Sequence, residues 1–83
     1  MDMQSELDRE RATLVKADRD IAQGQARLDR QATLLREIDV RGEDTGEAER
    51  LLALLRDTLA QWEDHRTLIL QRIDDLAARL VPP

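Results

Sequence analysis

Apolar side chains recur along the first half of this chain at alternating spacings of three and four residues. One series of positions seven apart is Leu7, Leu14, Ile21, Leu28 and Leu35, and the intervening series is Glu10, Ala17, Gly24, Gln31 and Ile38. Such spacing is typical of the seam along which one long helix packs against another. It predicts a helix over about residues 4–41.

The second half of the chain repeats this pattern. Its two series are Leu52, Leu59, Arg66, Ile73 and Leu80, and Ala48, Leu55, Trp62, Ile69 and Leu76. They predict a second helix over about residues 45–80. This helix should end there because the two final prolines cannot continue it.

The segment between the two patterns carries signals for ending one helix and starting the next. Gly42 suits the left-handed residue that follows a helix. Asp44 is a good N-cap, and Glu47 three residues later completes a capping box. A turn of residues 42–44 is short, and short connections join antiparallel neighbours. The predicted fold is all-α: residues 1–83 form a single domain, an antiparallel two-helix hairpin of coiled-coil type.

A turn centred near residue 43 pairs residues whose numbers sum to about 86, which sets Gly24 opposite Trp62. The missing side chain would leave room for the indole, although a tolerated surface glycine is the alternative. Arg66 falls on the seam near Ile21 and within reach of Asp18 or Asp20. Arg66 either specifies the register or the choice of partner, or it is a side chain that packs its aliphatic part on the seam, extends its charged end into water and has no such role.

The second helix carries more apolar surface than one seam can bury. Leu51, Leu54, Leu68 and Leu70 lie off the seam, and His65 lies close to them. A bare hairpin would leave these leucines in water and would bury too little surface for its size. We therefore expect the chain to form a homodimer, a four-helix bundle that associates through the second helix.

Charge and composition narrow the range of partners. The chain has 18 acidic and 13 basic side chains, a net charge of -5, and no cysteine. Nucleic acid is not an expected partner because phosphate binding needs clustered basic residues. No apolar run is long enough to span a membrane, and the acidic start is unlike a secretory signal. The expected location is the cytoplasm.

Catalytic and metal-binding chemistry find little support in the residues. His65 is the only histidine, and Trp62 stands where the Glu-x-x-His pair of a di-metal bundle would place its glutamate. Carboxylates along a straight two-helix hairpin have no pocket to shift their pKa values towards catalysis. We expect no enzyme activity, no cofactor and no metal.

The turn and its surroundings resemble a known set of proteins. The residues that carry the resemblance are Gly42-Glu43-Asp44-Thr45, Ala48, Leu51-Leu52 and His65-Arg66. They are similar to small bacterial helical-hairpin proteins of unassigned activity, which often have Gly-His-Asp-Thr at the turn. Glu43 replaces that histidine here. The resemblance implies the hairpin fold and no particular function.

The sequence favours a non-enzymatic interaction or scaffold module that self-associates through its second helix. One alternative is a small regulator that presents the apolar face of this helix to a different protein. Another is a bundle that binds a metal or small ligand around His65 and Glu63 at a dimer interface.

Overall fold

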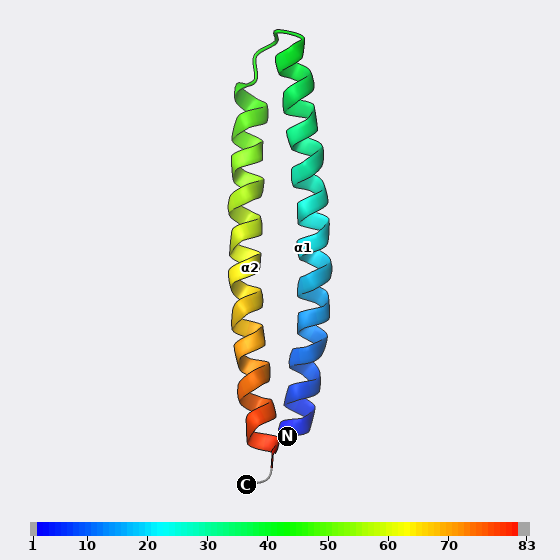
Figure 1. Cartoon of the computed structure of the whole chain (residues 1–83), viewed down its shortest axis with the longest axis vertical. Coiled ribbons are helices and arrows are strands. Elements are labelled where there is room, and N and C mark those ends of the chain that lie inside the picture. Colours follow the sequence, from blue (N-terminus) through cyan, green and yellow to red (C-terminus); the bar gives the residue numbers. More distant parts are fainter. Residues whose placement is uncertain (1, 82–83) are drawn as a thin grey trace.

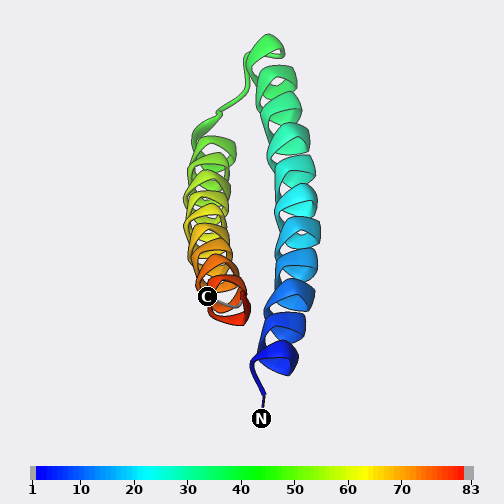
Figure 2. The ribbon, with the colours of Figure 1, turned by 60° about the horizontal axis from the view of Figure 1, so that its bottom comes forward.

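The chain folds as a hairpin of two long helices, as predicted. The computed structural model describes residues 2–81, in which α1 spans Met3–Val40 and α2 spans Gly46–Leu80. The helices run antiparallel and lie side by side, with the turn at one end and both termini at the other (Figure 1). The second view shows the same arrangement (Figure 2), and the molecule is 65 Å long and only 18 Å by 15 Å across. The predicted boundaries agree with these helices to within one residue.

A side-chain cap that the sequence analysis did not predict starts α1. The Asp2 carboxylate accepts a hydrogen bond of 2.7 Å from the backbone amide of Ser5. This contact satisfies one of the amides that have no partner at the start of a helix. Hydrogen bonds from the amide and then from the side chain of Ser5 hold the pKa of the Asp2 carboxyl below its usual value.

The end of α1 confirms the role predicted for Gly42. Its φ is +73°, the left-handed conformation that favours glycine. The amide of Gly42 donates to the Asp39 carbonyl at 2.9 Å, and the amide of Glu43 donates to the Ile38 carbonyl at 3.1 Å. These two bonds form a Schellman motif, which satisfies the last carbonyls of the helix.

The start of α2 differs from the prediction by one residue. The N-cap is Thr45 rather than Asp44, and the Thr45 hydroxyl donates to the Glu49 carboxylate at 3.1 Å instead of capping an amide. Asp44 still satisfies the start of the helix, because its carboxylate accepts from the Gly46 amide at 2.9 Å. The predicted capping box between Asp44 and Glu47 is therefore wrong. The Asp44 carboxylate bonds to the amide of the second residue after it, so the helix begins one residue later than predicted.

The predicted seam holds the two helices together. Every seam position of α1 is buried or half-buried, and so are those of α2 apart from Trp62 and Leu80. The buried apolar side chains among the described residues are Leu7, Ala48, Leu52, Leu59 and Ile69, of which Ile69 is fully buried. This core is small, because two helices that pack against each other bury side chains only along the line where they touch.

Candidate functional site

Four leucines form an exposed apolar surface on one side of the hairpin, which we call the leucine face: Leu34 of α1 and Leu51, Leu54 and Leu68 of α2. The side chains of Leu51, Leu54 and Leu68 are 45%, 61% and 49% exposed. Leu34 lines the same hollow as Leu51, between the two helices. Leu54 follows Leu51 by one helical turn, and Leu68 lies two heptads beyond Leu54, so the three share a face of α2.

Leu70 does not belong to this surface, although the sequence analysis grouped it with the other leucines. It is half-buried. At 100° per residue it lies roughly 160° around the helix from Leu54. Leu70 therefore points to the opposite flank of the seam, and the predicted apolar set is reduced by one member.

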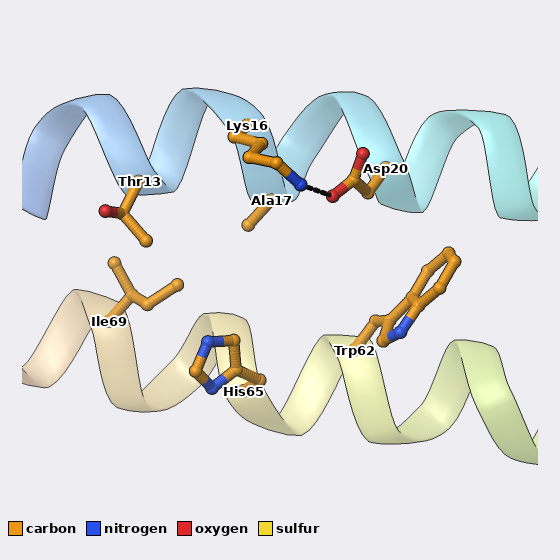
Figure 3. A pocket seen from close by; sticks show the side chains of 7 residues that line it. All are labelled: Thr13, Lys16, Ala17, Asp20, Trp62, His65 and Ile69. Atoms are coloured by element: carbon orange, nitrogen blue, oxygen red, sulfur yellow. Dashed lines mark hydrogen bonds and ion pairs between the residues drawn. The ribbon is translucent and has the colours of Figure 1, made fainter.

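A second hollow on the same side surrounds Trp62 and His65. It has a volume of about 180 Å³ and is lined by Thr13, Lys16, Ala17, Asp20, Trp62, His65 and Ile69. The Trp62 indole extends from α2 towards α1, and the short side chain of Ala17 leaves the space beside it open (Figure 3). Lys16 and Asp20 form an ion pair of 2.7 Å on the α1 rim (Figure 3).

The two hollows and the leucines all lie on one flank of the hairpin. Asp20 of one hollow and Leu34 of the other are fourteen residues apart in α1, as are Leu51 and His65 in α2. Fourteen residues are close to four whole turns, so each pair points to the same side. His65, predicted to lie beside the interaction surface, is exposed on this flank, one turn before Leu68.

The predicted contact between Gly24 and Trp62 is present. A Cβ atom placed on Gly24 would lie 3.1 Å from Cζ3 of the indole and 3.3 Å from Cδ1 of Leu59. Gly24 is buried, whereas Trp62 is 36% exposed. The glycine is therefore a packing residue and not a tolerated surface position.

Arg66 lies at a half-buried place on the seam and pairs with Asp18. The pairing spans the two helices, on the flank opposite the leucine face. Asp18, one of two predicted partners, takes this role, whereas Asp20 lies on the other flank and pairs with Lys16. The guanidinium of Arg66 stays partly exposed, so its ion pair contributes modestly to stability.

Two polar seam residues stand out that the sequence analysis left without a role. The Gln31 amide donates to the Ala48 carbonyl at 3.2 Å and so links the helices near the turn. Glu10 has one carboxylate oxygen buried without a hydrogen-bond partner. The only signal in the sequence was their polar character at seam positions, which does not reveal the contacts that they make.

The described part of the chain shows no prepared metal centre. Within residues 2–81, no group of three or more His, Cys, Asp or Glu side chains is placed to hold a metal ion. Neither helix in that range is both long and apolar enough to cross a membrane.

Comparison of the chain with protein-family models, with curated proteins and with solved structures found no match. The resemblance of its turn to bacterial helical-hairpin proteins therefore stays a prediction. The functional argument rests on the geometry of the leucine face and its two hollows.

Proposed function

We propose that this protein is a non-enzymatic interaction module that self-associates through α2 into a four-helix bundle. The observation that carries the proposal is the leucine face. Burying a leucine side chain contributes roughly 1.5–3 kcal/mol, and three leucines of one helix face are about half in water here. Monomeric proteins rarely leave so many large apolar side chains together on one surface.

The total surface area supports association. The chain exposes 6197 Å². A compact monomer of its mass, 9.5 kDa, would expose roughly 5,000 Å² by the usual scaling of area with mass. The excess is larger than the ~800 Å² per partner that a stable dimer buries. A second copy on the leucine face would bring the chain close to the compact value.

The test is a double substitution, Leu54→Glu with Leu68→Glu, compared with the natural chain by light scattering and thermal melting. The natural chain should have twice the chain mass at micromolar concentration, and its melting temperature should rise with concentration by mass action. The double variant should have one chain mass and a melting temperature independent of concentration.

Val15→Glu is the matched control, because Val15 is 59% exposed but points away from the leucine face. It also puts a glutamate at an exposed apolar position, with one added charge instead of two, and should leave the mass unchanged. A natural chain that is monomeric and fully helical would contradict the proposal. Binding of a different protein through the same leucines would then be the remaining interpretation.

A further inference from the structure

The residues on the flank that contains the leucine face follow a regular spacing, and this spacing favours one orientation of two copies in a dimer. Along α2 it follows a stripe at alternating spacings of four and three residues: Glu47, Leu51, Leu54, Thr58, Gln61, His65, Leu68 and Arg72. The spacing reads the same in both directions. Such a stripe can pack against a second copy of itself in antiparallel orientation, with its centre between Thr58 and Gln61.

The chemistry of this stripe is complementary about that centre. Glu47 at one end would face Arg72 of the second copy at the other. Leu51 would face Leu68 of the second copy, and Leu54 would face the imidazole of His65. Each apolar side chain then meets an apolar or aromatic one, and each end of the stripe meets opposite charge. A shift of one heptad in either direction would place these leucines against polar or charged side chains instead.

A second stripe runs along α1 on the same flank of the hairpin. Its centre lies at the same level along the hairpin as the centre of the α2 stripe. It consists of Lys16, Asp20, Gln23, Arg27, Arg30, Leu34 and Glu37, again spaced by four and three residues. Its middle residue is Arg27, one turn from Gly24, which packs on Leu59 and Trp62. The centre of the α2 stripe lies at this level too. One two-fold axis can therefore serve both stripes, and it sets Lys16 opposite Glu37 of the second copy.

We infer that two copies pack face to face about this axis, with α2 on α2, α1 on α1 and the two turns at opposite ends of the bundle. The inference rests on the proposed self-association and adds its orientation. In this arrangement Leu51 and Leu68 of α2 cover one another and Leu54 is covered by His65, while the polar stripe of α1 meets its own copy. In the alternative with both turns at one end, α2 would cover α1, and Leu68 would lie over the Lys16–Asp20 ion pair.

Two features of the arrangement are unfavourable and provide a test of their own. Asp20 would face Leu34 of the second copy, but Lys16 already neutralises it at 2.7 Å. Arg27 would lie beside Arg27 of the second copy on the axis. Arg27→Gln should therefore tighten the dimer several-fold by removing this repulsion. With the turns at one end, Arg27 would face Thr58 and Gln61, and the substitution would not tighten binding.

The decisive experiment measures the distance between spin labels in the dimer. The chain has no cysteine, so a single cysteine can be introduced cleanly. Labels at Glu43→Cys, in the turn, should lie about 50 Å apart, because each turn is some sixteen helical residues from the axis at ~1.5 Å per residue. Labels at Ala26→Cys, on the outer side of α1 at the axis, should lie within about 30 Å and serve as the control.

A charge exchange tests the register independently. Glu47→Arg or Arg72→Glu alone should raise the dissociation constant of the dimer by about tenfold, and the double exchange should restore it. The two residues are roughly 37 Å apart within one helix, so this rescue can arise only between copies. Glu49→Arg is the matched control: it reverses a charge in the same first turn without facing the second copy.

The outcomes separate the orientation from the association. A dimer with turn labels about 50 Å apart and with charge rescue supports both. A dimer with turn labels under about 25 Å apart, or without rescue, overturns the orientation and leaves the proposed self-association standing. A chain that stays monomeric overturns both.

Discussion

The indole of Trp62 lies against the backbone of Gly24, so closely that a Cβ atom on the glycine would be 3.1 Å from the ring. A glycine in the middle of a helix costs about 1 kcal/mol relative to alanine. The cost is accepted here because the absent side chain leaves room for the largest residue of the chain at the seam. The contact also lies near the middle of both helices, so it marks the register of the hairpin.

Gly24→Ala should lower the free energy of unfolding by about 1 kcal/mol. The added methyl group would be held between Trp62 and Leu59, and overpacking of 1–3 kcal/mol outweighs the gain in helix propensity. Chemical denaturation measures the change. In a Trp62→Ala background the same substitution should stabilise the protein, because the indole is gone and Leu59, the other close neighbour, can shift into the space it leaves. A stabilising effect in the natural background would show that the indole moves aside freely.

Glu10→Leu should raise the free energy of unfolding by about 1 kcal/mol or more. One of its carboxylate oxygens is buried on the seam without a partner, and leaving a polar group in this state is costly. A leucine would extend the apolar seam beside Leu76, with which Glu10 lines a hollow. Glu6→Leu, an exposed position in the same hollow, is the control and should change stability little. Equal effects of the two substitutions would contradict a special environment at Glu10.

Gly42→Ala should lower the free energy of unfolding by roughly 1–2 kcal/mol, because the position requires a positive φ. No atom would obstruct the added Cβ, so the cost comes from the backbone alone. Gly42→Asn should cost less, since asparagine tolerates the left-handed region better. Thermal melting of the two variants gives the order, and an alanine variant as stable as the natural chain would contradict the prediction.

The start of α1 should fray as the pH falls. Hydrogen bonds from Ser5 lower the pKa of the Asp2 carboxyl in the folded chain below its unfolded value. The cap therefore stabilises the helix fully above the unfolded value of ~3.9, and its contribution is lost as the pH falls through the folded pKa. The protection factor of the Ser5 amide against hydrogen exchange, followed by NMR, should fall in this range. Asp2→Asn should remove most of the pH dependence while keeping a capping residue.

Local signals in the sequence determined the two helices, the turn and the pairing between them. A seam of three-and-four spacing specifies which side of each helix is covered, and Gly42 marks where the first helix ends. Because the connection is short, the register follows from counting back from the turn. The contact of Gly24 with Trp62 was predictable for this reason.

Only the tertiary structure decided which residues beside the seam are covered and which partners they contact. Leu54 and Leu70 look equivalent as apolar residues outside the main pattern, yet one is largely exposed and the other half-buried. Arg66 found its partner in Asp18 rather than Asp20, and the N-cap of α2 shifted from Asp44 to Thr45. These outcomes depend on how two helices lie against each other in three dimensions. A position on the flank of a helix is covered only where side chains of the neighbouring helix reach it, and its spacing along the chain does not specify that reach.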